Sequence, residues 1–235
     1  MVSSSGIGVV VPHDMALDRE LWRWVPEDVS LYLTRTPRDP RPVTVETVAA
    51  ISELERVAAG VVDLMAPRPG VCAYACASGS FVRGLAGERA LVEAMCAAGA
   101  PAAVTTSGAL LTALRVMAVR TVAVATPYHV GITERLDAFL TEAGFELAGS
   151  AHLGLMADIW KVPYDVTADL IRRADHPSAD AIFVSCTNLR TYDVVAELEA
   201  ELGKPVITAN QATIWASLRL LGRAATGPGQ RLLED

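Results

Sequence analysis

The chain has 235 residues, a formal net charge of −7 and a hydrophobic fraction of 51%, with 6% aromatic and 20% charged residues. This length predicts a globular protein of one large domain or two small ones, able to bury a substantial core without disulfides. An acidic chain lacks the concentrated positive field that phosphate binding needs, so we expect no nucleic-acid partner. The only lysines are Lys161 and Lys204, which leaves few candidates for Schiff-base chemistry.

The cysteines and the lack of targeting signals bear on compartment and metal binding. We expect Cys72, Cys76, Cys96 and Cys186 to be reduced thiols in the cytoplasm, because the N-terminus lacks the basic and apolar regions of a signal peptide. No metal site is expected, because Cys72 and Cys76 have no second cysteine pair and no histidine near them in sequence. Glycine, proline and a polar run interrupt the uncharged stretch 94–114, so we expect no membrane partner.

Short apolar runs rich in β-branched residues alternate with longer segments of helical period. This alternation is typical of an α/β protein with parallel strands. We predict strands at residues 7–11, 30–33, 71–75, 102–105, 121–125, 146–150, 181–185 and 206–208. We predict helices at residues 44–65, 88–98, 107–117, 130–143, 165–173 and 190–202. Gly203 is expected to end the last of these helices in the left-handed conformation.

The chain contains an internal repeat. Residues 101–115 read PAAVTTSGALLTALR and residues 205–219 read PVITANQATIWASLR, with the first proline and the final Leu-Arg pair coinciding without a gap. Upstream of each copy, a predicted strand leads to a cysteine, Cys76 in one case and Cys186 in the other. The repeat therefore predicts two similar half-units, each with a cysteine at the C-terminal end of a parallel strand.

Cys76 and Cys186 are the candidate reactive residues. The C-terminal ends of parallel strands form the functional edge of a sheet, where helix N-termini lower a thiol pKa and backbone N–H groups bind carboxylates. If the halves pack about a pseudo-twofold axis, the two thiols face each other across one cleft, which suits proton transfer or attack from opposite sides. The alternative is that both are ordinary buried cysteines, as we expect for Cys72 and Cys96; the matching repeat positions favour function.

Four segments carry a resemblance to a known superfamily: IGVVVPHD at 7–14, ACASGSFVRG at 75–84, VAVATPYHVGITERLDAFL at 122–140 and VSCTNLRTYDVVAELEAELGKPVITANQA at 184–212. The chain resembles the Asp/Glu racemase superfamily, within it the branch of maleate cis-trans isomerases, arylmalonate decarboxylases and EutA-like proteins. The resemblance implies a cofactor-independent α/β protein of two similar lobes, each with a mainly parallel sheet flanked by helices. The lobes would be related by a pseudo-twofold axis, with the active site between them. We expect residues 1–105 plus 211–235 to form the first lobe and residues 106–210 the second.

The resemblance also implies roles for site residues. Cys186 matches the second family cysteine, which is the lone proton donor in arylmalonate decarboxylases. Cys76 stands where isomerases and racemases keep their first cysteine and where those decarboxylases have glycine. Tyr128 matches a tyrosine whose hydroxyl binds a substrate carboxylate. The rest of the carboxylate pocket would come from the N–H and hydroxyl groups of Ala77, Ser78, Thr187 and Asn188. With so few lysines, we expect these groups to bind the carboxylate without a cationic clamp.

The chain departs from the maleate isomerases near its N-terminus. That group tends to read Pro-Ser-Ser-Asn, with the asparagine on the substrate carboxylate, whereas this chain reads Pro12-His13-Asp14-Met15. We expect Pro12 and Asp14 to contribute to the substrate site. An ionised Asp14 would repel a dicarboxylate, which argues against maleate itself; alternatively, Asp14 caps the next helix.

The leading hypothesis is a cofactor-independent two-cysteine isomerase of maleate cis-trans isomerase type that acts on a small carboxylic acid. In that mechanism the resemblance assigns Cys76 as the thiolate that adds to an alkene carbon, and Cys186 as acid and base at the neighbouring carbon. The alternatives are an amino-acid racemase of Asp/Glu type, an arylmalonate-type decarboxylase and a non-catalytic carboxylate-binding protein. The apolar helix faces leave a homo-oligomer open, and the sequence names no particular substrate.

Overall fold

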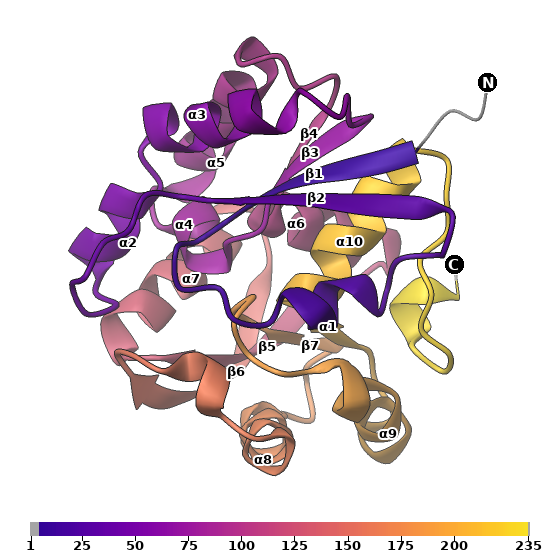
Figure 1. The fold of residues 1–235 in the computed structure, drawn as a ribbon. Helices are drawn as coiled ribbons and strands as arrows, with labels where there is room; N and C mark the ends of the chain where they lie inside the picture. Colours follow the sequence, from indigo (N-terminus) through magenta and orange to yellow (C-terminus); the bar gives the residue numbers. More distant parts are fainter. Residues whose placement is uncertain (1–4, 235) are drawn as a thin grey trace.

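Two four-stranded sheets form the framework of the computed structural model, which describes residues 5–234 (Figure 1). The first sheet has the order β2-β1-β3-β4, with β1 (Ser5–Val11), β2 (Val29–Arg35), β3 (Val71–Tyr74) and β4 (Ala103–Thr105). The second sheet has the order β6-β5-β7-β8, with β5 (Thr121–Tyr128), β6 (Glu146–Leu155), β7 (Ala181–Val184) and β8 (Val206–Thr208). Every strand pairing is parallel. The second order repeats the first, so the expected two-lobed α/β fold is confirmed.

A strand is present at each of the eight predicted positions. The central strands β3 and β7 are buried at every residue, because helices cover both faces of a parallel sheet and the strand must then be apolar throughout. This burial explains why a continuous apolar run predicts these strands well. The edge strand β6 is half exposed and continues to Leu155, beyond the apolar segment that predicts it.

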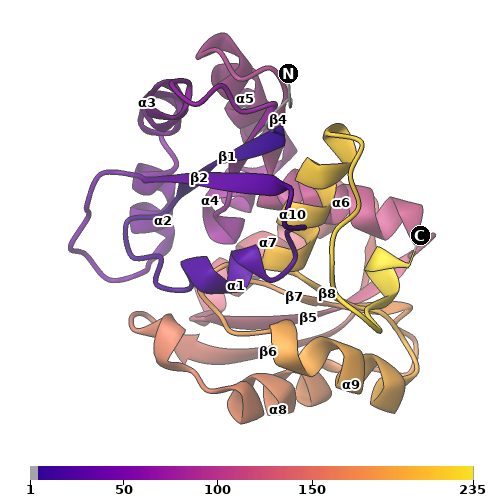
Figure 2. The same ribbon diagram turned by 45° about the vertical axis from the view of Figure 1, so that its right-hand side comes forward.

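The helices cover the sheets and fill the space between them (Figures 1 and 2). They are α1 (Asp18–Trp22), α2 (Val45–Ile51), α3 (Leu54–Leu64), α4 (Ala77–Phe81), α5 (Gly84–Ala97), α6 (Thr106–Val116), α7 (Val130–Glu142), α8 (Tyr164–Ala174), α9 (Tyr192–Leu202) and α10 (Ala209–Leu220). The single helix predicted at 44–65 is wrong, because α2 ends at Ile51 and α3 begins only at Leu54. Ser52, between them, donates its hydroxyl to the Ala49 carbonyl. Gly203 ends α9 with a φ of 71°, as predicted.

The repeat copies form β4 with α6 and β8 with α10. The two helices lie side by side in Figure 2, and the buried hydroxyls of Thr106 and Thr213 lie 2.8 Å apart between them. The gapless alignment of the copies is wrong by one residue at the strands, because Thr105 of β4 and Thr208 of β8 are the equivalent residues that cap these helices. Helix α10 also contacts β3 and β4 of the first sheet. The residue boundaries of the lobes stay a prediction.

No helix within residues 5–234 combines the length and apolar character that crossing a membrane requires.

Candidate active site

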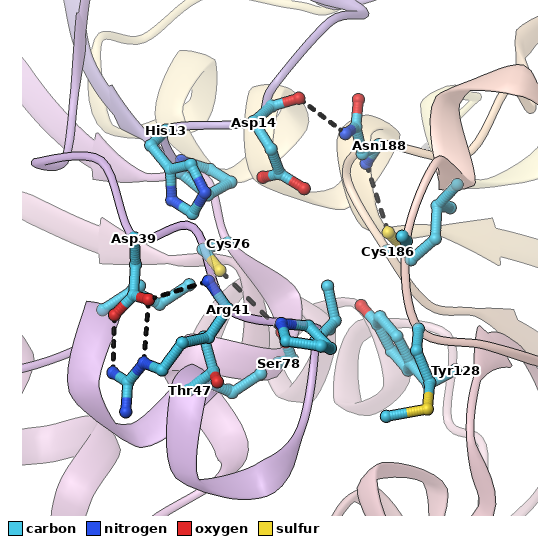
Figure 3. A pocket seen from close by; sticks show the side chains of 18 of the residues that line it. His13, Asp14, Asp39, Arg41, Thr47, Cys76, Ser78, Tyr128, Cys186 and Asn188 are labelled. Carbon is cyan, nitrogen blue, oxygen red and sulfur yellow. Dashed lines mark hydrogen bonds and ion pairs between the residues drawn. The ribbon is translucent and has the colours of Figure 1, made fainter.

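The C-terminal ends of β3 and β7 bring Cys76 and Cys186 to one cavity of about 640 Å³ (Figure 3). Each cysteine lies two residues beyond the end of its strand, in the middle of its own sheet. The loops that follow β1, β2 and β6, helix α2 and Tyr128 at the end of β5 complete the cavity wall. All the residues that the sequence predicts for the site line this cavity: Pro12, Asp14, Cys76, Ala77, Ser78, Tyr128, Cys186, Thr187 and Asn188.

Cys76 is the N-cap residue of α4 and is only 4% exposed. Burial raises the pKa of its thiol; the Gly79 N–H and the Tyr74 and Ser78 hydroxyls oppose this rise in pKa, and the charge of Asp14 adds to it. The Ser78 oxygen lies 4.0 Å from the sulfur. A Cβ at Gly79 would lie 3.0 Å from the Cys76 sulfur and collide with the Tyr74 hydroxyl. Only glycine therefore fits at this position without displacing the thiol.

Cys186 lies in the loop between β7 and α9, with a φ of 95°. That left-handed backbone costs a non-glycine residue of order 1–3 kcal/mol, so the surrounding structure must hold it in place. The Asn188 N–H donates to the sulfur at 3.3 Å. Burial raises the pKa of Cys186 to about 12, opposed by the Tyr128 hydroxyl and the Asn188 N–H and reinforced by the charges of Asp14 and Cys76.

The predicted lowering of both thiol pKa values by helix N-termini is wrong. Cys186 adjoins no helix, and α4 beside Cys76 has only five residues. Burial dominates at both sulfurs and raises both pKa values, because a thiolate loses more hydration in the cavity wall than the nearby N–H groups return. Cys186 is therefore a protonated thiol at neutral pH, which is the form that donates a proton.

The polar side chains beside Cys186 bind the other lobe. The Thr187 hydroxyl donates to the Ala75 carbonyl at 3.1 Å. The Asn188 amide donates to the Asp14 carbonyl at 2.9 Å and accepts from the Ala16 N–H at 3.0 Å. These two side chains thus join the lobes and are not free to bind a ligand. If Thr187 and Asn188 bind a substrate carboxylate as predicted, they must do so mainly through their backbone N–H groups.

Asp14 points its carboxylate into the cavity (Figure 3). The alternative that it caps the next helix is wrong, since Leu17 is the N-cap residue of α1 and no side chain caps that helix. A turn closed by the hydrogen bond from the Met15 N–H to the Pro12 carbonyl, 3.0 Å long, presents Asp14 to the cavity.

Two arginines on the cavity wall are missing from the predicted site. Arg38 and Arg41 lie on the loop between β2 and α2, which meets the loop after β6 through a 2.8 Å hydrogen bond from the Val43 N–H to the Met156 carbonyl. Arg41 donates through Nε and Nη2 to the buried carboxylate of Asp39, at 2.8 and 2.5 Å, and holds the pKa of that carboxyl far below its usual range. The sequence did contain a signal for these arginines, because this Pro- and Arg-rich segment follows the C-terminal end of a predicted parallel strand, where site residues are expected.

All the cysteines are free thiols. Cys72 is buried within β3, as predicted, and burial raises its pKa to about 11. The prediction that Cys96 is a core residue is wrong, because its side chain lies on the exposed face of α5. Within the described range, no three or more His, Cys, Asp or Glu side chains gather as a metal site would require.

Sequence comparison relates the chain to two kinds of enzyme. The family described as arylmalonate decarboxylase matches residues 43–233. The arylmalonate decarboxylase of Bordetella bronchiseptica is 36% identical over 205 residues, which are 85% of this chain and 81% of that protein. A maleate isomerase of Pseudomonas putida is 31% identical over 192 residues, which are 78% of this chain and 76% of that protein.

Solved structures of the same two kinds of enzyme share the fold. A double mutant of arylmalonate decarboxylase in its liganded form has a TM-score of 0.90 at 32% identity, covering 98% of this chain and 99% of that one. A Nocardia farcinica maleate cis-trans isomerase mutant with a covalently bound succinylcysteine intermediate has a TM-score of 0.85 at 26% identity, covering 98% of this chain and 99% of that one.

Proposed function

The chain belongs to the arylmalonate decarboxylase family, and we propose that it is a cofactor-independent isomerase that acts on a small carboxylic acid through Cys76 and Cys186. The observation that carries this proposal is the pair of free thiols, which come from equivalent strands of the two lobes and line one cavity. Two groups that can each hold or release a proton on opposite sides of a ligand allow a reaction to begin and end without a cofactor.

The environments of the two sulfurs suit different roles. The Gly79 N–H and the Tyr74 and Ser78 hydroxyls oppose the burial that raises the pKa of Cys76, and they therefore favour its thiolate relative to a purely apolar site. Cys186, with a pKa of about 12, holds its proton firmly. We therefore assign Cys76 as the nucleophile and Cys186 as the acid.

The isomerisation that fits these roles is balanced without an added reactant. Because the pKa of Cys76 is raised, its thiol first releases a proton to solvent. The resulting thiolate forms a bond to one alkene carbon while the π electrons take the Cys186 proton at the other carbon. Rotation about the resulting single bond precedes the reverse step, in which the Cys186 thiolate removes a proton, the double bond re-forms and the carbon–sulfur bond breaks. The Cys186 thiol is thereby restored, and the released Cys76 thiolate regains its proton from solvent.

The second candidate is decarboxylation of a malonate-type acid, which uses Cys186 alone as proton donor. The 36% identity to the Bordetella bronchiseptica enzyme favours it. The thiol at Cys76 opposes it, because a single proton donor leaves that buried cysteine without a part in the reaction. Carbon dioxide release that persists in Cys76→Gly would establish this candidate in place of the first.

The test is deuterium incorporation, followed by NMR in deuterium oxide with maleate, aspartate, glutamate and arylmalonates as substrates. We expect a carbon-bound position to acquire deuterium in the unaltered protein and to lose that exchange, by at least about a hundredfold, in Cys76→Ala and in Cys186→Ala. Cys96→Ala is the matched control, since that thiol is exposed and lies outside the cavity. Full activity in either cavity variant would overturn the two-thiol mechanism.

A further inference from the structure

The cavity contains an acidic side chain, Asp14, that has no ion-pair partner among the described residues. Five charged residues line it, and two ion pairs account for most of them: Arg41 with Asp39, and Lys161, outside the lining, with Asp158. Asp14 and Arg38 remain, and among residues 5–234 neither has an ion-pair partner within 4.0 Å. Arg38 lies on the loop after β2. Asp14 lies on the loop after β1, and its side chain points into the cavity toward the two sulfurs (Figure 3).

The position of Asp14 is fixed by the same residue that holds the Cys186 sulfur. The Asn188 side chain binds the backbone on both sides of the Asp14 carboxylate, at the Asp14 carbonyl and at the Ala16 N–H, while its own N–H donates to the Cys186 sulfur. Asp14, Cys76 and Cys186 line the same cavity, and the charge of Asp14 adds to the raised pKa of both thiols. Asp14 is therefore held at the place where a substrate would react.

The carboxylate of Asp14 has no structural task. It makes no hydrogen bond to another described residue and caps no helix, and the backbone alone holds its loop. A negative charge at this place weakens the binding of a second carboxylate on the substrate and strengthens the binding of a cationic group.

We propose that Asp14 selects acids that carry a protonated nitrogen beside the reacting carbon, so that the preferred substrates are amino or amidino acids and not dicarboxylates. This inference rests on the proposed function, because Cys76 and Cys186 define where the reacting carbon lies. The carboxylate of the substrate accepts hydrogen bonds from the backbone N–H groups near the sulfurs, and its nitrogen group faces Asp14. The competing arrangement, in which Arg38 recruits a second carboxylate, is an outcome of the test.

The first experiment measures the charge near the sulfurs without any substrate. The protein reacts with aminoethyl and sulfonatoethyl methanethiosulfonate, a cation and an anion of similar size, and mass spectrometry quantifies modification at each cysteine. Cys96 is an internal reference, because it is exposed and lies outside the cavity. We expect Cys76 and Cys186 to favour the cationic reagent relative to Cys96, and Asp14→Asn to reduce that preference about tenfold.

Asp63→Asn is the matched charge control, since Asp63 is exposed on α3 and lies outside the cavity. It should leave the reagent preference unchanged. An equal preference at Cys76, Cys186 and Cys96 in the unaltered protein, or no change in Asp14→Asn, would overturn the inference.

The second experiment compares ligands that differ only in the group at issue. Phenylglycine and phenylmalonate exchange an ammonium for a carboxylate on the same carbon, as do alanine and methylmalonate. We expect the amino acids to protect Cys76 and Cys186 from iodoacetamide at lower concentration than their dicarboxylate partners, and Asp14→Asn to reverse that order. Stronger protection by the dicarboxylates, an unchanged order in Asp14→Asn or no protection by any of the four acids contradicts the inference.

These outcomes are separate from those of the deuterium experiment. Loss of the charge preference leaves a two-thiol enzyme with another substrate class. Full exchange in Cys76→Ala or Cys186→Ala overturns the mechanism whatever the charge preference.

Discussion

Cys186 keeps a left-handed backbone, with a φ of 95°, although it has a side chain. Most residues avoid this conformation because Cβ crowds the neighbouring carbonyl, and glycine alone escapes that crowding. The backbone turn aims the sulfur at the Asn188 N–H and into the cavity wall. The strained backbone conformation thus positions the sulfur of Cys186, the predicted proton donor.

This strain predicts an unusual order of stability among variants. Cys186→Ala and Cys186→Gly both remove the thiol, but only glycine relieves the strained backbone. We therefore expect Cys186→Gly to be more stable than Cys186→Ala, with a free energy of unfolding about 1 kcal/mol higher. Urea unfolding of the two variants measures the difference. Greater stability of the alanine variant would show that the backbone at this residue is not strained.

At the scale of elements, a buried carboxylate from the first lobe organises the start of α9. Glu20 of α1 accepts from the Thr191 N–H at 2.6 Å, the Thr191 hydroxyl at 2.9 Å and the Tyr192 N–H at 3.1 Å. Burial raises the pKa of Glu20 although these three donors oppose the rise. The N-terminus of α9 is therefore capped by a residue distant in sequence, and the Cys186 loop that precedes α9 is held at its far end.

Removing this cap should destabilise the chain. Glu20→Ala leaves the N–H groups of buried Thr191 and half-buried Tyr192 without an acceptor, at a cost of about 1–3 kcal/mol in the free energy of unfolding. Glu20→Gln keeps an acceptor oxygen and should lose less. Urea unfolding compares the two variants, and equal losses would mean that packing, not hydrogen bonding, is what Glu20 supplies.

At the scale of the whole molecule, the two sheets repeat one strand order and meet at a single cavity. Helix α10 contacts the first sheet as well as β8, which comes from the second. The lobes are thereby joined through their cores as well as through the loops around the cysteines. An oligomeric state and a cytoplasmic location stay predictions from the sequence.

The buried thiols make the stability of the whole molecule sensitive to alkaline pH. Burial raises the pKa of Cys186 from 9.0 to about 12, so the folded state binds this proton more tightly than the unfolded state does. The stabilising contribution is complete below about pH 9 and is lost as the pH rises toward 12, by up to about 1.4 kcal/mol per pH unit.

Urea unfolding at a series of pH values from 8 upward, over the range in which the chain remains folded, checks this dependence. We expect Cys186→Ser to flatten the decline and the control Cys96→Ser, at an exposed thiol, to leave it unchanged. An identical decline in Cys186→Ser and the unaltered protein would contradict the raised pKa.

Local patterns determined the α/β class, the eight strands and the pairing of Cys76 with Cys186. Strands buried on both faces need continuous apolar runs, and the duplication left both cysteines at the same point beyond their strands. The short helices α1 and α4 escaped prediction because a five-residue helix gives no clear helical period.

Only the tertiary structure decided the chemistry around those cysteines. The raised thiol pKa values come from desolvation by segments far apart in sequence, and so does the use of the Asn188 amide to hold Asp14 in place. Likewise, packing decided that Cys96 is exposed and that Arg38 and Arg41 reach the cavity. Burial and electrostatic interactions depend on distance in space, and a linear pattern records only distance along the chain.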